Sequence, residues 1–195
     1  MNEIVTIEST FKVNKVVASP ERGAYIEQSD FVCSDKEKEL LEKINNNDIV
    51  EVYKNRVVGF TTFMCAYSTC LLLKSDTVKN ILYLADNKCL ATRASEKVKE
   101  FINQSGDGTK FKRLSHDLIE TESGNKILFM SKNSLKNSCR GWRFDLVIVD
   151  ECLIGFDDYC ILGPIVSIGG KLITTFLPDK VGAGVKKDTV VWPVL

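Results

Sequence analysis

Two stretches of the chain carry side chains of the kind that bind phosphate and a divalent metal ion. The first runs from Lys54 to Thr62, reads Lys-Asn-Arg-Val-Val-Gly-Phe-Thr-Thr and follows the apolar segment Ile49 to Tyr53. The second reads Asp-Leu-Val-Ile-Val-Asp-Glu and ends in two adjacent carboxylates, Asp150 and Glu151. A glycine-containing loop that leads from a strand into a helix presents backbone N–H groups to phosphate oxygens, and carboxylates bind Mg²⁺ or take a proton from water. Together the two stretches predict a site for the hydrolysis of a nucleoside triphosphate.

The first stretch, called the phosphate loop below, departs from the common pattern G-x-x-x-x-G-K-[ST] at two positions. Phe60 stands where the lysine is expected, and Lys54 replaces the first glycine. Lys54 lies at the end of the strand and has the length to reach back across the loop to the β- and γ-phosphates, while Arg56 is a second cation for the γ-phosphate. Thr61 opens the next helix and offers its hydroxyl to Mg²⁺. The alternative is an ordinary strand–turn–helix in which Lys54 and Arg56 are solvated loop charges.

The carboxylate pair is predicted to act on the metal and on water. Leu146 to Val149 is uniformly apolar, as in a parallel strand covered on both faces. Because α/β sheets place binding crevices at the carboxyl ends of their strands, we expect Asp150 to hold Mg²⁺ and Glu151 to orient or deprotonate the attacking water. The alternative is an acidic strand end that faces solvent. The predicted nucleotide-binding residues are Lys54, Asn55, Arg56, Val57, Val58, Gly59, Phe60, Thr61 and Thr62, and the predicted catalytic residues are Glu151, Arg56 and Lys54.

Three further groups are candidates for contact with phosphate or DNA. An apolar strand that begins at Lys171 ends in Thr174 and Thr175, whose hydroxyls are placed to sense the γ-phosphate; the alternative is the ordinary β-propensity of threonine. Arg140 precedes the carboxylate strand and is a candidate phosphate or DNA contact, with a loop salt bridge as the alternative. A local basic region for DNA is formed by Lys110, Lys112, Arg113, Lys132 and Lys136.

The elements that position these groups predict an α/β fold with a central, mainly parallel sheet. Strands are expected at 49–53, 81–85, 146–149 and 171–176, helices at 61–73, 88–104 and 158–167, and a hairpin at 119–130. Ser34 to Glu37 has capping-box spacing, which predicts a helix that ends in the run Asn45 to Asp48. Pro20 and Gly23 mark a turn in the N-terminal segment. Strands that alternate with helices imply right-handed crossovers and a parallel sheet.

The charge, the cysteines and the apolar runs of the sequence indicate how the protein could contact DNA and where in the cell it is expected. The 195 residues carry 26 Lys plus Arg and 26 Asp plus Glu, so the net charge is zero, and we expect any contact with DNA to be local and transient. The seven cysteines lack C-x-x-C spacing and there is one histidine, which favours reduced thiols over a zinc site. The apolar run Phe63 to Leu73 is shorter than the roughly 20 residues that span a bilayer, and no signal peptide is visible. We therefore expect an intracellular, soluble domain.

The motifs in this order resemble those of the ATPase domain of phage terminase large subunits, the motors that pump DNA into viral capsids. K-x-R-x-x-G-x-T-T is followed by R-G-x-x-x-D-L-V-I-V-D-E and then by a strand that ends in T-T before a proline, and the resemblance runs from about 35 to 178. It implies an ASCE-type P-loop NTPase fold, with a central mainly parallel β-sheet flanked by helices on both faces. It further implies that Lys54 and Arg56 are the cations of a deviant Walker A loop, Thr61 and Asp150 the metal residues, and Glu151 the catalytic base.

The resemblance also implies ATP and Mg²⁺ as cofactors, and Thr174 and Thr175 as the motif that couples hydrolysis to movement. The implied partners are double-stranded DNA, a capsid portal, a small terminase subunit and further copies of the chain in a ring, in the cytoplasm of a host cell. Residues 1–33 are expected to pack on the core near the adenine site, and residues 34–195 to form the ATPase core. The glutamine with which the family recognises adenine is not matched, and Gln28 is the nearest substitute. No nuclease activity is expected, because the sequence has no further acidic cluster of the kind that cleaves DNA.

Two other functions fit the same residues. One is a helicase-like, DNA-dependent ATPase, which would separate the strands of a forked duplex. The other is a degenerate phosphate-loop domain that does not hydrolyse nucleotide and serves in assembly or DNA binding, for which Phe60 at the usual lysine position is the best support.

Overall fold

The computed structural model describes residues 11–19, 23–54, 59–75, 77, 79–106, 108–139, 141–152, 156–176 and 190–191, and the statements below concern these residues. The α-helices are α1 (Asp35–Asn46), α2 (Phe60–Lys74), α3 (Lys88–Ser105), α4 (Leu135–Ser138) and α5 (Phe156–Ile165), with a 3₁₀ turn at Lys132–Ser134. The strands are β1 (Lys12–Ser19), β2 (Gly23–Asp30), β3 (Ile49–Tyr53), β4 (Asn80–Ala85), β5 (Phe111–Leu114), β6 (Leu118–Thr121), β7 (Lys126–Ser131), β8 (Phe144–Asp150), β9 (Val166–Phe176) and β10 (Val190–Val191).

A mostly parallel sheet forms the centre of the molecule. Within the described residues it has eight strands in the order β10-β3-β9-β8-β4-β7-β6-β5. The strands from β10 to β7 are parallel, and β6 and β5 extend one edge as antiparallel strands. Because β9 lies between β3 and β8, the carboxyl ends of these three strands lie side by side. The side of the sheet on which all the parallel strands end is called the carboxyl edge below. The predicted phosphate loop and carboxylate pair are both attached to that edge.

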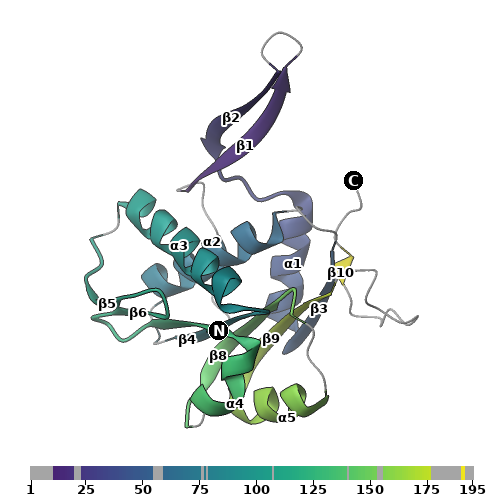
Figure 1. The fold of residues 1–195 in the computed structure, drawn as a ribbon, viewed down its shortest axis with the longest axis vertical. Coiled ribbons are helices and arrows are strands. Elements are labelled where there is room, and N and C mark those ends of the chain that lie inside the picture. Colours follow the sequence, from purple (N-terminus) through teal and green to yellow (C-terminus); the bar gives the residue numbers. More distant parts are fainter. Residues whose placement is uncertain are drawn as a thin grey trace.

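Helices cover both faces of the sheet, as expected. α1, α2 and α3 lie on one face, and α4 and α5 lie on the other (Figure 1). Alternate side chains of β4 enter the two cores: Ile81 and Tyr83 pack towards α2 and α3, whereas Leu82 and Leu84 pack towards α4 and α5. The expected mixed α/β architecture with a mainly parallel sheet is therefore confirmed.

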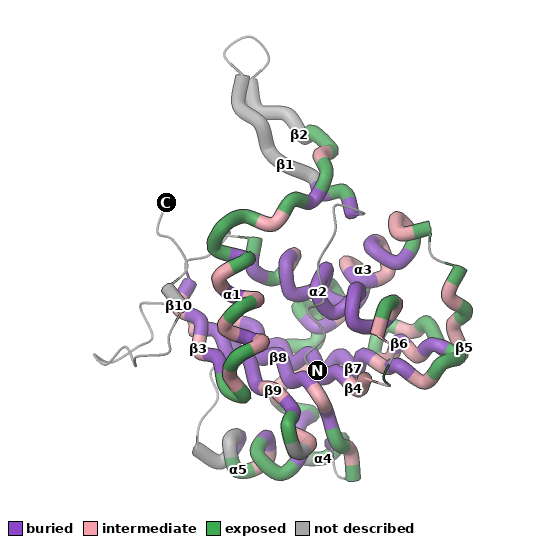
Figure 2. Tube along the Cα trace, turned by 180° about the vertical axis from the view of Figure 1, so that it is seen from behind, coloured by how far each residue is buried: buried purple, intermediate pink, exposed green. Residues whose placement is uncertain are grey.

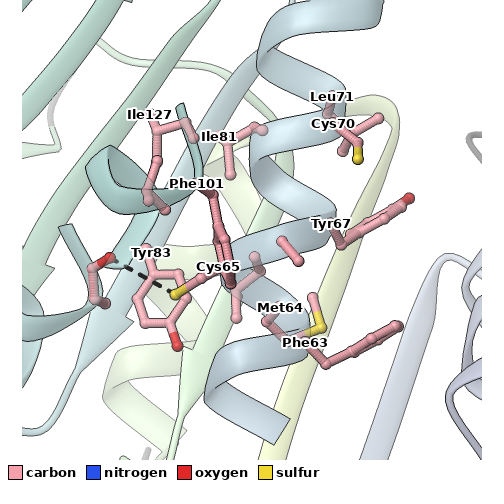
Figure 3. Packing of buried hydrophobic residues seen from close by; sticks show 14 of the residues in the cluster. Phe63, Met64, Cys65, Tyr67, Cys70, Leu71, Ile81, Tyr83, Phe101 and Ile127 are labelled. Atoms are coloured by element: carbon pink, nitrogen blue, oxygen red, sulfur yellow. Dashed lines mark hydrogen bonds between the residues drawn. The ribbon is translucent and has the colours of Figure 1, made fainter. Parts of the chain in front are cut away.

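The helices before and after β3 in the sequence form for different reasons. α1 begins with a capping box in which the Ser34 N–H donates to the Glu37 side chain and the Glu37 N–H donates to the Ser34 hydroxyl; Leu40 and Ile44 then face the core. α2 is apolar nearly all round and is buried along most of its length (Figure 2). Figure 3 shows its side chains beside those of β4 and α3. α2 is thus held rigidly over the sheet, with its first turn at the carboxyl edge.

The N-terminal strands β1 and β2 form a separate antiparallel hairpin that projects from the body of the molecule (Figure 1). Its base is attached to α3: the rings of Phe11 and Phe31 lie 4.8 and 6.5 Å from that of Phe101, and the Lys12 N–H donates to Gln104. Gln28, the expected substitute for an adenine-reading glutamine, is exposed on β2.

Several element boundaries differ from the sequence-based expectation. The last helix ends at Ile165, and β9 begins at Val166 instead of Lys171, so Ser167 lies in a strand. Gly170 explains the difference, because a Cβ at this position would lie 2.9 Å from the carbonyl oxygen of Phe144. The glycine allows two strands to approach at an irregularity in their register and does not mark a loop.

Three smaller differences concern the edges of the sheet. β5 was not expected, because its FKRL sequence has no apolar alternation, and β10 follows the strand that was expected to be the last. Leu90, which has helical spacing with the buried Ala94 and Val98, is nevertheless 37% exposed because it lies in the first turn of α3, beyond the carboxyl edge of the sheet. No helix among the described residues is long and apolar enough to cross a membrane.

Candidate functional site

Side chains from four elements meet at the carboxyl edge of the parallel sheet. Lys54 directly follows β3, and Thr61 lies in the first turn of α2. Asp150 ends β8, Glu151 follows it, and Thr175 lies near the end of β9. The register places them side by side: the Lys54 N–H donates to the carbonyl of the last β9 residue at 3.1 Å, which extends the β3–β9 pairing past the end of β3. Residues far apart in the sequence thus form one polar cluster over an apolar core.

Asp150 is the centre of this cluster. Its Oδ2 accepts the hydroxyl of Thr61 at 2.6 Å and the hydroxyl of Tyr83 at 2.7 Å, and its Oδ1 lies 3.4 Å from the hydroxyl of Thr175. The residue is only 7% exposed. A buried carboxylate requires such partners, because an unpaired charge in the interior is costly. A threonine hydroxyl that donates its proton to a carboxylate still has lone pairs to offer to a metal ion.

Lys54 is buried among the carboxylates. Its side chain is 3% exposed, and its Nζ lies 2.5 Å from Glu151 Oε1 and 3.8 Å from Asp150 Oδ1. The same ammonium group lies 5.3 Å from the centre of the Phe60 ring, within the range of a cation–π contact. Phe60 occupies the position at which the common pattern has its lysine. The ammonium group of Lys54 therefore lies close to the residue that replaces the usual lysine.

Glu151 has an uncommon backbone conformation that decides where its side chain lies. Its φ of 51° is the only positive value among the non-glycine residues that the structure describes. The Glu151 N–H donates to the Thr175 hydroxyl at 2.7 Å, and that hydroxyl donates to the Val149 carbonyl at 3.3 Å, which holds the turn in place. Successive residues of a strand point to opposite faces, but because of this turn both carboxylates approach Lys54. Glu151 is the more accessible of the two, with a side chain that is 31% exposed.

Gly59 is the N-cap of α2 and has a left-handed backbone, with φ of 80°. Nothing lies within 4 Å of the point that a Cβ would occupy, so the glycine is required by its dihedral angle and not by crowding. It offers no side chain to cap the first N–H groups of α2, which leaves them for an anion. Asn55, Arg56, Val57 and Val58 lie outside the described residues, as does Arg140.

Tyr83 belongs to the cluster and was not identified from the sequence. It is buried in β4, and burial, followed by the nearby Asp150 carboxylate, raises the pKa of its hydroxyl well above the ordinary value. The hydroxyl therefore stays protonated and donates. The available signal was the one polar group in the apolar run Ile81 to Ala85, because a buried tyrosine hydroxyl generally has a hydrogen-bond partner.

The contact of Thr174 with phosphate and that of the basic region with DNA stay predictions. Thr174 is buried, and its hydroxyl has no hydrogen-bond partner within the described part of the chain; as the neighbour of Thr175 in a strand, it faces the other side of the sheet. In the expected basic region, Lys112 lies 3.4 Å from Glu120 and Arg113 lies 3.6 Å from Asp117, and both basic side chains are exposed.

The donor set of the cluster fits Mg²⁺. Thr61, Asp150 and Glu151 offer oxygen atoms only, which is the preference of this ion. The described residues contain no group of three or more His, Cys, Asp or Glu placed to hold a metal ion. Mg²⁺ is commonly bound by one or two carboxylates together with the phosphates of a nucleotide, and not in a cage made by protein alone.

The sheet order, the helices on both faces and the matches to known proteins given below define a P-loop NTPase fold. The family described as "Type III restriction enzyme, res subunit" matches residues 35–152, which is more than half of the chain, and the chain belongs to this helicase-like family of P-loop proteins. No curated protein matches the sequence.

Solved structures with the same fold include phage packaging proteins. The chain is similar to the large terminase of bacteriophage HK97 with a TM-score of 0.61 and 15% identity, and to the large terminase of a thermophilic bacteriophage in complex with ADP with a TM-score of 0.55 and 17% identity. It is also similar to the packaging motor assembly of bacteriophage Phi-29, with a TM-score of 0.57 and 11% identity. These alignments cover 75%, 73% and 80% of this chain, and 33%, 38% and 55% of the respective structures. The chain thus spans about one third to just over half of their length.

Proposed function

We propose that this domain binds ATP with Mg²⁺ and hydrolyses it, and that hydrolysis moves double-stranded DNA, as in the motor domain of a phage terminase large subunit. The observation that carries the proposal is the meeting of Lys54, Thr61, Asp150 and Glu151 at one edge of the sheet. A cation, a hydroxyl, a buried carboxylate and an accessible carboxylate are the groups that phosphoryl transfer to water requires.

The roles follow from burial and contacts. Asp150 is buried and bonded to Thr61, so this pair would hold Mg²⁺, which when bound neutralises charge on the phosphates. Glu151 is accessible to solvent and would accept a proton from the water that attacks the γ-phosphorus in line with the leaving oxygen of the diphosphate. The first N–H groups of α2 and the ammonium of Lys54 would bind the phosphates, and Arg56 of the loop would supply a second cation.

The contact between Lys54 and Glu151 gives this cycle an order. While Lys54 is paired with Glu151, the carboxylate oxygen is occupied by an ammonium group and is not available to a water molecule. Phosphates that draw Lys54 away would free the carboxylate at the moment when substrate is bound. Binding of nucleotide would therefore prepare the catalytic base.

The proposed partners come from the similar structures. Double-stranded DNA, a capsid portal, a small terminase subunit and a ring of further copies are proposed because the fold is that of phage large terminases and of a genome packaging motor, and such a motor would act in the host cytoplasm. Thr175 bonds the backbone of the proposed base and is a candidate link between hydrolysis and movement, together with its neighbour Thr174.

The test of the proposed reaction is release of phosphate from ATP in the presence of Mg²⁺. We expect slow but measurable turnover by the wild type and loss of at least about 100-fold in Glu151→Gln, since a general base contributes about 10²–10⁴-fold. Glu122→Gln is the matched control, because Glu122 is exposed in the turn before β7, at the opposite edge of the sheet. Turnover by Glu151→Gln equal to that of the control would remove Glu151 from this role.

A second candidate function is a helicase-like, DNA-dependent ATPase. The observation that favours it is membership of the helicase-like family that matches residues 35–152. The same site would hydrolyse ATP, so the two functions differ in what the hydrolysis does to DNA. Separation of the strands of a forked duplex would support the helicase, whereas ATP-dependent movement along an intact duplex without strand separation would support the packaging motor.

A further inference from the structure

A buried tyrosine contacts the carboxylate that the proposed function assigns to Mg²⁺. Tyr83 lies in the middle of β4, paired with Phe129 of β7 and Ile148 of β8, and is 1% exposed. Its hydroxyl donates to Asp150 Oδ2 at 2.7 Å, and the same oxygen accepts the hydroxyl of Thr61 at 2.6 Å. One carboxylate oxygen thus receives two O–H donors from two different elements.

The position of the tyrosine ring is fixed from several sides. Its centre lies 5.9 Å from that of Phe129, and Cys65 of α2 lies beside it (Figure 3). In the register of β4 and β8, Ala85 is opposite Asp150, so Tyr83, two residues earlier, projects from the same face of the sheet. The small side chain at Ala85 leaves the hydroxyl free to approach the carboxylate. The ring is therefore a rigid support with its hydroxyl at a fixed point.

A phenylalanine would fill nearly the same volume in this core without a buried hydroxyl, which is costly unless it is bonded. The bond to Asp150 at 2.7 Å offsets this cost, and Thr61 and Cys65 are the other polar groups beside the hydroxyl, so its contribution lies mainly at the carboxylate. With Oδ2 held by two donors, rotation of the carboxylate is restrained, and Oδ1 stays turned towards Thr175 and Lys54, at 3.4 and 3.8 Å. Removal of a group that holds a metal ligand in this way typically lowers the affinity for the metal by about 10- to 100-fold.

We infer that Tyr83 is a positioning residue for Mg²⁺, which acts by fixing the carboxylate of Asp150 against rotation before the metal arrives. The inference rests on the proposed function, because it takes Asp150 as the metal carboxylate. It adds a residue from β4, a strand that contributes none of the groups expected from the sequence. Tyr83 itself does not touch the metal or the nucleotide in this role.

The test is calorimetric titration of a non-hydrolysable ATP analogue into the full chain, once with Mg²⁺ and once with EDTA. The ratio of the dissociation constant in EDTA to that in Mg²⁺ measures how much the metal strengthens the binding of the analogue. Tyr83→Phe removes one oxygen atom and is expected to lower this ratio by about 10-fold or more, within the range of about 10–100-fold found for partners of metal ligands. Binding in EDTA is expected to stay within about twofold of the wild type, which also reports that the site is folded.

Tyr67→Phe is the matched control. Tyr67 is a second buried tyrosine of the same core, on α2, and its side chain points away from Tyr83 (Figure 3). The control is expected to keep the wild-type ratio. A wild-type ratio in Tyr83→Phe, or equal losses with Mg²⁺ and with EDTA, would overturn the positioning role and leave the proposed function standing. A wild type that gains no affinity from Mg²⁺, or binds no analogue, would overturn both.

Discussion

Replacing Glu151 with Gln is predicted to tighten the binding of nucleotide while it stops hydrolysis. The ammonium of Lys54 lies 2.5 Å from Glu151 Oε1 and 3.8 Å from Asp150 Oδ1. A phosphate that binds Lys54 must compete with the Glu151 carboxylate, which also repels the anionic ligand. Gln keeps the shape of the side chain and removes its charge, so this competition weakens.

The magnitude follows from the burial of the pair, in which Lys54 is 3% and Glu151 31% exposed. Exposed ion pairs contribute about 0.2–1 kcal/mol, and removal of one partner from a fully buried pair costs about 3–5 kcal/mol. This pair lies between the two limits, since water reaches one partner. Removal of the Glu151 charge is therefore expected to favour the nucleotide by about 1–2 kcal/mol, or roughly 5- to 30-fold in Kd.

The assay is titration of a non-hydrolysable ATP analogue in EDTA, so that changes in metal binding do not enter. The wild type is compared with Glu151→Gln and with Glu122→Gln, whose side chain is exposed at the opposite edge of the sheet. The gain in affinity should shrink as salt is raised, because the pair is partly exposed to solvent. Binding by Glu151→Gln that is equal to or weaker than wild type would refute the competition between carboxylate and phosphate.

Two further predictions concern the supports of the site, and a third concerns the reactivity of a buried cysteine. Gly59→Ala should destabilise the fold by about 1–2 kcal/mol in denaturant unfolding, because of its φ of 80°, whereas Gly108→Ala, with equally open space and no such angle, should change it little. Thr175→Val leaves the Glu151 N–H without its acceptor and should cost about 1–3 kcal/mol, while Thr174→Val, at a hydroxyl with no hydrogen-bond partner among the described residues, should be neutral or stabilising; equal costs would contradict the assignment. Burial raises the pKa of Cys139 to about 11, so alkylation at pH 8 should label the exposed Cys89 first, as peptide mapping by mass spectrometry would show.

Much of the fold follows from local patterns. The capping box of Ser34 and Glu37 and the apolar face that follows predict α1, and the short apolar runs predict β3, β4 and β8. The start of β9 was predicted at Lys171, five residues after its start at Val166, and Gly170 lies between the two. The reason for this glycine is the close approach of the Phe144 carbonyl, a contact with a distant strand that one sequence does not display.

The candidate site likewise contains contacts that the sequence predicts and contacts that it does not. The rule that binding groups lie at the carboxyl ends of parallel strands predicts that Lys54 and Asp150 lie near each other. The contacts of Tyr83 and Thr175 depend on strand order, because β4 and β9 flank β8 on its two sides. The turn at Glu151 depends on the same order, since its N–H is bonded by the β9 threonine. Residue types therefore suggest the chemistry, while the neighbours of β8 decide how its carboxylates are held.

The central claim is that Lys54, six residues before the usual lysine position at Phe60, is the cation that binds the phosphates. Calorimetric titration of Mg²⁺ and a non-hydrolysable ATP analogue into wild type, Lys54→Ala and Lys79→Ala tests it directly, because Lys79 precedes β4 at the opposite edge of the sheet. We predict binding by the wild type and by Lys79→Ala, and a loss of at least about 100-fold in Lys54→Ala, as for removal of one partner of a buried charged contact. Binding by Lys54→Ala that matches the control would contradict the account.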